Sequence, residues 1–116
     1  MPRYVLLEHD YPALHWDFML EADDVLRTWR LASLPRVDEA VRASATFDHR
    51  PLYLDYEGPI SGNRGRVFRW DAGTFVWEIN TPNEVNVCVT GERLHGPIRL
   101  AHVGGEEWTL HYKPDA

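Results

Sequence analysis

The sequence is poor in cysteine, lysine and long apolar runs, and two of these shortages exclude classes of protein. Cys88 is the only cysteine in 116 residues, so the chain can form neither a disulfide framework nor a cysteine-based zinc cluster. No apolar run approaches the roughly 18 residues that a membrane-spanning helix requires, and the first residues do not resemble a signal peptide. We therefore expect a cytoplasmic protein with no membrane partner, in which Cys88 is a small core residue.

A basic surface is also missing. The net charge is -6 at pH 7, which argues against bulk non-specific binding of nucleic acid but not against local binding of one phosphate group. Of the twelve basic residues, only Lys113 is a lysine. Arginine clamps phosphate better than lysine because its guanidinium is planar, although genome composition can produce the same bias.

What the chain does contain is a series of short β-branched and aromatic runs, separated by Gly, Pro, Asn and Asp. This pattern is typical of all-β proteins, and a hydrophobic content of 44% is enough for the core of one domain over residues 1–116. Strands are predicted over residues 4–8, 14–20, 25–31, 44–47, 66–70, 74–78, 84–90, 98–103 and 107–112. Turns are predicted at 23–24, 71–74, 81–83 and 104–105, and one short helix at 36–42. So many short strands favour a small closed or nearly closed β-barrel.

The segment 14–21 alternates strictly between apolar and other residues, as a half-buried strand does. Its core-facing set is Leu14, Trp16, Phe18 and Leu20. Its opposite face carries His15, Asp17, Met19 and Glu21. His15 and Asp17 lie two residues apart, about 6 to 7 Å along a strand, and the turn after the preceding strand can return His9 to the same end. Two imidazoles and one carboxylate suit Mn²⁺, Fe²⁺ or Zn²⁺.

Less specific interpretations compete with this one. A His-x-Asp pair on a strand is common without a metal. Glu21 fits a carboxylate that accepts a hydrogen bond from a ligand histidine and orients it, and it fits a surface carboxylate at a strand end equally well.

Further motifs follow in order along the chain. They are His9-Asp10 with residues 14–21, Val-Leu-Arg-Thr-Trp at 25–29, Asp-His-Arg-Pro-Leu-Tyr-Leu-Asp-Tyr-Glu-Gly at 48–58, Trp-Asp-Ala-Gly-Thr at 70–74, Gly-Glu-Arg-Leu-His-Gly at 91–96 and Trp-Thr-Leu at 108–110. Each motif is weak alone. Taken together in this order and spacing, nearly the whole chain resembles the 3′-phosphoesterase domain of bacterial DNA ligase D.

The resemblance implies a small β-barrel and a Mn²⁺-dependent activity on the 3′ end of DNA or RNA–DNA. Enzymes of this family remove a terminal ribonucleoside and then the 3′-phosphate. By motif match, His9, His15 and Asp17 are the expected metal ligands, and His49 and Tyr53 the catalytic residues that engage the scissile phosphate. Because the acidic chain should bind free DNA weakly, recruitment by a separate DNA ligase or end-binding protein is a plausible partnership.

Two departures from the family pattern concern phosphate binding. Met19 stands where the family has an arginine beside the metal, and the segment after the Trp29 strand lacks the family's lysine. Removing one charged transition-state contact typically costs about 10² to 10³ in rate. A replacement is expected from Arg64, whose loop can also offer backbone N–H groups, or from Arg66 or Arg30.

Two alternative functions stay open at this point. A catalytically weak or silent relative would bind a metal and a phosphorylated end without turnover, as Met19 suggests. An iron-dependent oxygenase would use His15, Asp17 and a distal histidine such as His95.

Overall fold

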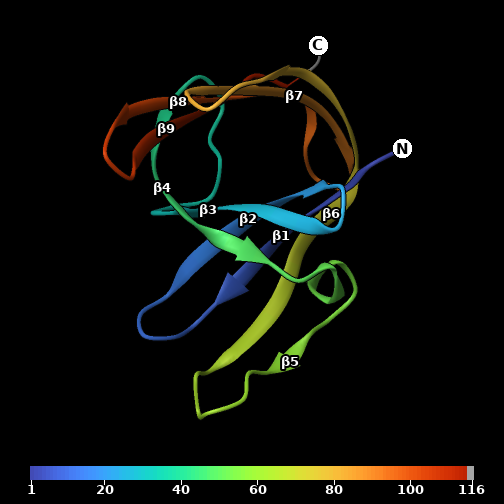
Figure 1. Ribbon diagram of the computed structural model, residues 1–116, viewed down its shortest axis with the longest axis vertical. Helices are drawn as coiled ribbons and strands as arrows, with labels where there is room; N and C mark the ends of the chain where they lie inside the picture. The colour runs from blue at the N-terminus through green and yellow to red at the C-terminus, as the bar shows by residue number, and fades with distance from the viewer. Residues whose placement is uncertain (115–116) are drawn as a thin grey trace.

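The computed structural model describes residues 1–114 and consists mainly of antiparallel β-strands (Figure 1). The strands are β1 (Arg3–His9), β2 (His15–Ala22), β3 (Val25–Leu31), β4 (Ala40–His49), β5 (Gly58–Pro59), β6 (Arg66–Asn80), β7 (Glu84–Gly91), β8 (His95–Gly104) and β9 (Glu107–Tyr112). Antiparallel neighbours run in the order β1-β2-β3-β4-β9-β8-β7-β6, and β6 pairs back to β1. Eight strands therefore close into a barrel, with β5 added to β6, which confirms the predicted all-β barrel.

Alternate side chains along each strand point inward and fill the barrel interior. On β7, Val85, Val87 and Val89 are buried, whereas Cys88 lies between them and is only half-buried. The prediction that Cys88 is a core residue is therefore wrong, because strand parity gives it the opposite face from its valine neighbours. The largest side chains of this interior come from all sides of the barrel and include Tyr4, Phe18, Trp29, Phe75 and Trp108.

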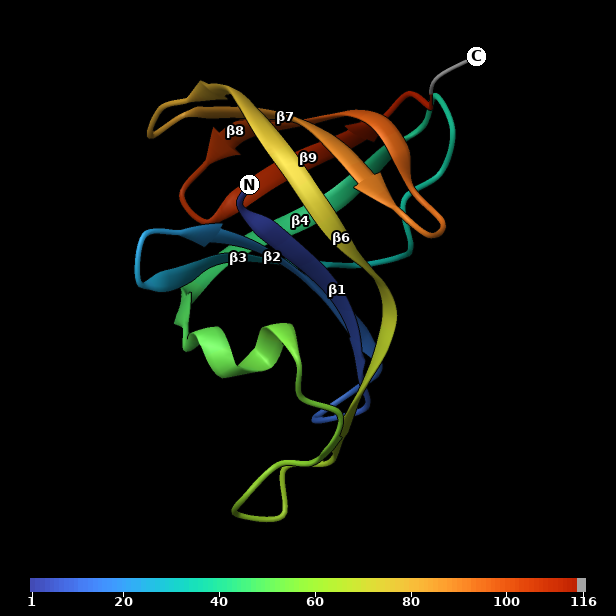
Figure 2. The ribbon, with the colours of Figure 1, turned by 90° about the vertical axis from the view of Figure 1, so that its right-hand side faces the viewer.

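A second, smaller core lies outside the barrel wall formed by β1, β2 and β6. A one-turn 3₁₀ helix, η1 (Pro51–Leu54), packs there against the outer face of the wall (Figure 2). The buried residues of this second core are Val5, Leu7, Met19, Leu26, Leu54 and Val67. β1 and β2 are consequently buried on both faces over part of their length.

The predicted turn at residues 71–74 is wrong, since these residues lie inside the continuous strand β6. The side chain of Asp71 is buried and accepts hydrogen bonds from the backbone N–H groups of Glu92, Arg93 and Leu94 in the β7–β8 turn. Gly73 faces the backbone of β7 so closely that a Cβ atom there would collide with it. Residues that are typical of turns therefore serve cross-strand packing in this strand.

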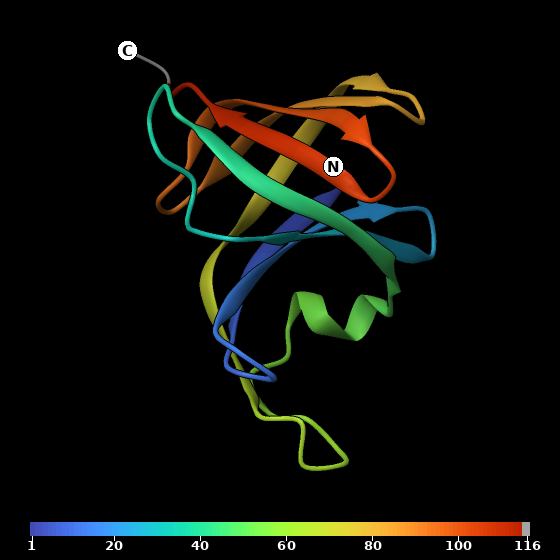
Figure 3. The same ribbon diagram turned by 90° about the vertical axis from the view of Figure 1, so that its left-hand side faces the viewer.

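The predicted helix at 36–42 is also wrong. β4 begins at Ala40, and Asp38 has a positive φ of 58°, which a right-handed helix does not allow. The C-terminal end of β4 leads directly into η1 (Figure 3). No helix within residues 1–114 has the length and apolar character needed to cross a membrane.

Candidate metal centre

The first strand pair brings two histidines and one aspartate together. His9 ends β1 and His15 begins β2, and the two are direct partners in the antiparallel register. Asp17 follows two residues later on the same face of β2. Its Oδ2 atom lies 3.3 Å from His15 Nε2 and 3.8 Å from His9 Nδ1, and one ligand atom from each residue lies within 4.8 Å of the others. The structure thus forms the three-residue cluster that the strand alternation and the His9 position predict.

Backbone carbonyls select the nitrogen that each histidine turns toward this cluster. His9 Nε2 donates to the carbonyl of Arg64 at 2.9 Å, and His15 Nδ1 donates to the carbonyl of Ala13 at 2.9 Å. In a neutral imidazole the other nitrogen is then an unprotonated acceptor. His9 Nδ1 and His15 Nε2 are therefore available as ligand atoms, in the arrangement that outer carbonyl partners impose on metal-binding histidines.

One of these ligand atoms has no hydrogen-bond partner in the described part of the chain. His15 Nε2 is buried, and its approach to Asp17 Oδ2 at 3.3 Å does not have hydrogen-bond geometry. A buried polar atom without a partner costs about 1 to 3 kcal/mol. A divalent cation bound between these atoms would satisfy it, so the donor set fits a metal of mixed nitrogen and oxygen preference.

Two members of the cluster, His9 and Asp17, line a cavity of about 410 Å³, within the usual size range of small-molecule sites. Its wall contains three arginines, Arg30, Arg50 and Arg64, against two carboxylates, Asp17 and Asp48. The cavity is therefore locally basic although the chain carries a net charge of -6. Such a lining favours an anionic ligand.

His49 and Tyr53 lie in the same cavity, as the motif match implies. His49 ends β4, and Tyr53 lies on η1 with its ring edge-on to the imidazole at 5.8 Å. His49 Nδ1 donates to the carbonyl of Phe47 at 3.0 Å. Burial lowers the pKa of His49 below its usual value, against the opposing negative charge of Asp17. The neutral ring thus leaves Nε2 as its open atom.

Met19 contributes no polar group to this site. Its side chain is 1% exposed and belongs to the second core, at the floor of the cavity. Arg30 is the register partner of Asp17 on the neighbouring strand, and its Nε lies 4.0 Å from Asp17 Oδ1. Arg64 also lines the cavity, but its guanidinium hydrogen-bonds to Ser61 in its own loop. Arg30 therefore lies beside the carboxylate of the cluster, whereas Arg64, the candidate that the sequence favours, is hydrogen-bonded within its own loop.

Three other residues considered in the sequence are not part of the cluster. Arg66 places its guanidinium over the ring of Phe68, on the strand that carries β5. Glu21 accepts a hydrogen bond from the backbone N–H of Arg3, near the far end of β2 from His15. His95 begins β8, and its backbone N–H donates to the hydroxyl of Tyr112. The oxygenase alternative, which needs a ligand such as His95, has no support from this geometry.

Phe47 and Arg50 also line the cavity and were missed as site residues. Both flank His49 in the sequence, so their nearness to the site follows from the His49 motif. Their orientation could not be inferred, because it depends on how β4 pairs with β3.

The fold and the cluster define a small antiparallel β-barrel with a candidate metal centre on its outer wall. A sequence model of the DNA Ligase D 3′-phosphoesterase domain matches residues 7–102, and the chain belongs to this family. It is 34% identical over 109 residues to the multifunctional non-homologous end joining protein LigD of Pseudomonas aeruginosa, covering 84% of the chain and 13% of that protein. It is 33% identical over 117 residues to the LigD DNA repair protein of Mycobacterium tuberculosis, covering 93% of the chain and 15% of that protein. The chain thus spans about one seventh of the length of these relatives.

Proposed function

We propose that this chain is a Mn²⁺-dependent phosphoesterase that heals 3′ ends, removing a terminal ribonucleoside and a 3′-phosphate from DNA or RNA–DNA. The observation that carries the proposal is the cluster of His9, His15 and Asp17, of which His9 and Asp17 line the cavity that also holds His49 and Tyr53. Family membership supports the reaction class. The locally basic cavity supports an anionic substrate.

The proposed metal ligands are His9 Nδ1, His15 Nε2 and a carboxylate oxygen of Asp17. Three protein ligands leave coordination positions open for substrate and water, and Mn²⁺ accepts this mixed donor set, as do Zn²⁺ and Fe²⁺. When bound, the ion would supply Lewis-acid polarisation of a phosphate oxygen and lower the pKa of a bound water.

The protein groups around the cluster would bind and orient the phosphate. Arg30 has a side chain that is 47% exposed and lies beside Asp17, so its guanidinium can present two N–H donors to phosphate oxygens. The Tyr53 hydroxyl can donate a third hydrogen bond. A phosphate dianion beside His49 would favour protonation of Nε2, and the resulting N–H would donate to a phosphate oxygen or protonate the leaving group.

A hydrolysis assay tests this proposal. The protein is incubated with Mn²⁺ and a primer–template that ends in a 3′-phosphate or in one 3′-ribonucleotide. Wild type is expected to release phosphate or the ribonucleoside, and His15→Ala to lose the activity, while the surface variant His111→Ala retains it. Absence of product with Mn²⁺, Zn²⁺ and Fe²⁺, or activity that survives in His15→Ala, would refute the proposal.

A second candidate function has one observation in its favour, the apolar Met19 at the floor of the cavity. In this case the chain binds a metal and a phosphorylated 3′ end but does not turn it over. Met19→Arg would then create activity that wild type lacks, whereas under the first proposal wild type is already active. For either function, the net charge of -6 makes a separate DNA ligase or end-binding protein the proposed recruiting partner.

A further inference from the structure

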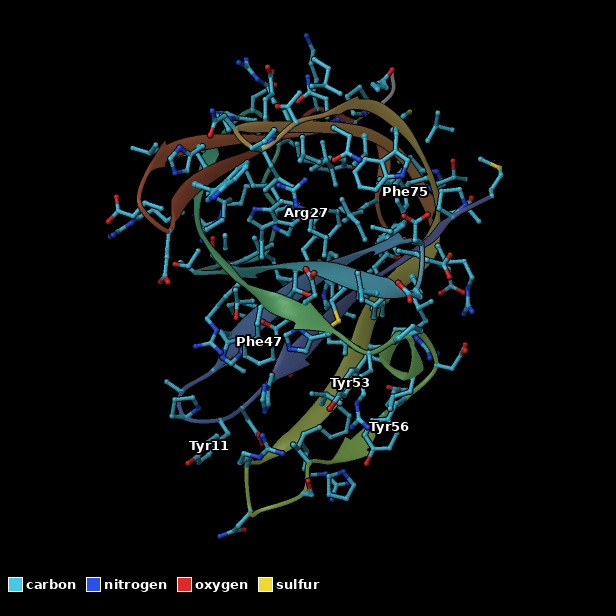
Figure 4. All side chains as sticks on the ribbon, in the orientation of Figure 1. Tyr11, Arg27, Phe47, Tyr53, Tyr56 and Phe75 are labelled. Carbon is cyan, nitrogen blue, oxygen red and sulfur yellow. The ribbon has the colours of Figure 1, made fainter. Side chains whose placement is uncertain are left out.

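Phe47 exposes an aromatic ring beside the candidate metal centre. Its side chain is 75% exposed, and the ring lies nearly parallel to the imidazole of His49, with the centroids 4.7 Å apart and the planes at 11°. One face of the Phe47 ring is therefore covered by His49, while the other face is open. Figure 4 shows Phe47 near the end of β4, on the same flank of the molecule as Tyr11 from the β1–β2 loop. Both residues line the cavity.

The pairing of β4 with β3 directs this ring out of the barrel. On β4, Val41 and Ala43 are buried in the barrel interior and Ala45 packs against it, so regular alternation would direct Phe47 inward as well. Three residue steps on β4, from Thr46 to His49, oppose only two on β3, from Thr28 to Leu26. This β-bulge adds one residue to β4, and bulges commonly re-aim side chains next to active sites.

An exposed ring at this position loses the stabilisation that burial in the barrel would bring. Burial of a phenylalanine side chain is among the larger single contributions that one residue makes to folding. The neighbouring backbone also acts on the site, because the carbonyl of Phe47 orients His49 through Nδ1. The bulge therefore places the aromatic ring and the imidazole of the site in one stack.

We propose that the open face of Phe47 is the platform for the nucleobase of the 3′-terminal nucleotide. This inference rests on the proposed function, in which the phosphate of that nucleotide lies at the His9–His15–Asp17 cluster. With His49 facing the phosphate and Phe47 stacked on His49, the base and the phosphate of one nucleotide are held by the same end of β4. A cavity of about 410 Å³ is of the size that takes such a ligand.

The platform predicts a specific substrate preference. Stacking on an aromatic side chain tolerates every base, because each base has a π-face. The protein would therefore accept all four bases at the 3′ end. It would discriminate against an abasic terminal nucleotide or a simple phosphomonoester, which offer the phosphate alone.

Kinetics on two matched oligonucleotides test the platform. Both end in a 3′-phosphate, one on a normal nucleotide and the other on a tetrahydrofuran abasic residue. Phe47→Ala is expected to raise KM for the base-bearing end about tenfold or more, with little effect on the abasic end, and Phe47→Trp to retain wild-type values. Phe68→Ala, which removes another exposed ring from β6, is the control and should change neither substrate. An equal effect of Phe47→Ala on both ends, or no effect on either, would overturn the platform.

A binding measurement separates this inference from the proposed function. A 2-aminopurine base at the 3′-terminal position loses fluorescence when it stacks on a ring. Wild type with Mn²⁺ is expected to quench it and Phe47→Ala is not, whether or not hydrolysis follows. Hydrolysis by wild type without quenching would refute the platform and leave the proposed function standing. Quenching without hydrolysis would refute the proposed hydrolytic function and leave the platform standing.

Discussion

Arg30 and Asp17 are direct partners across the β2–β3 pair, and Arg30 Nε lies 4.0 Å from Asp17 Oδ1. Asp17 is buried whereas the Arg30 side chain is 47% exposed, so the guanidinium is free to turn toward a ligand in the cavity. With its charges 4.0 Å apart and the arginine half exposed to solvent, this pair contributes little to stability. We therefore propose that Arg30 binds the phosphate, a function for which Met19 offers no group.

The first prediction follows from this relationship. Arg30→Ala should lower kcat/KM on a 3′-phosphate substrate by about 10²-fold, because one charged contact to the transition state is lost. Arg30→Lys should recover only part of this loss, since an ammonium group cannot bind two phosphate oxygens as a planar fork. Steady-state phosphate release measures both. Arg99→Ala is the matched control, because Arg99 is an exposed arginine on β8 that pairs with Glu84 on β7 and does not line the cavity.

The variant Arg64→Ala gives the comparison that could contradict this prediction. Its guanidinium is held by Ser61, so Arg64→Ala should have a smaller effect than Arg30→Ala. If the activity falls in Arg64→Ala and persists in Arg30→Ala, the assignment of Arg30 is wrong.

The second prediction concerns the metal itself. A cation that binds the folded state at 100 times its Kd stabilises it by about 2.7 kcal/mol, which corresponds to a Tm increase of roughly 10 °C for a domain of this size. Mn²⁺ should therefore raise the Tm of wild type, and EDTA should reverse the change. His15→Ala and Asp17→Asn should show no such increase. Equal Mn²⁺ affinity of wild type and His15→Ala in a calorimetric titration would refute the site.

The candidate cluster could be predicted from the sequence because it depends on local rules. Alternation along β2 places His15 and Asp17 on one face, and a short connection returns the chain so that His9 pairs with His15. The same alternation correctly places Met19 on that face. It fails at Leu14, which precedes β2 and is exposed rather than buried.

The features that could not be predicted depend on contacts between distant segments. Met19 is covered by η1, more than thirty residues later in the chain, so its face of the strand becomes a second core at this point. Phe47 turns outward only because β4 carries one extra residue opposite β3. Asp71 belongs to a segment whose residues are typical of a turn, but its hydrogen-bond partners lie in the β7–β8 connection. The periodicity of a sequence does not reveal which distant segments will pair.

The third prediction tests Asp71 as a stabilising residue of the barrel. Its carboxylate accepts three backbone N–H groups and the hydroxyl of Tyr4, the last at 2.6 Å. Asp71→Ala leaves these donors without partners and should lower the free energy of unfolding by about 3 to 5 kcal/mol in urea denaturation. Asp55→Ala removes a carboxylate from an exposed pair with Arg3 and should leave stability nearly unchanged. Similar stabilities for the two variants would contradict this role of Asp71.

The fourth prediction is an alkaline loss of stability that originates at Tyr4. Burial, together with the hydrogen bond to Asp71, raises the pKa of Tyr4 far above its ordinary value of 10.0. The folded state thus keeps the phenol protonated, whereas the unfolded chain ionises it at about pH 10. By linkage, the stabilisation is complete below the unfolded pKa and is lost progressively as the pH rises above it. Urea denaturation between about pH 8 and about pH 11 should show this decline in the free energy of unfolding.

Tyr4→Phe isolates that contribution, because phenylalanine has no proton to lose. The variant should be less stable than wild type at neutral pH, where it lacks the hydrogen bond to Asp71, but its stability should fall less steeply above about pH 10. Tyr11→Phe keeps the buried Tyr4 phenol intact and should retain the wild-type slope. Parallel pH profiles for wild type and Tyr4→Phe would mean that other groups cause the alkaline transition, and that the buried Tyr4–Asp71 pair does not set the upper pH limit of the fold.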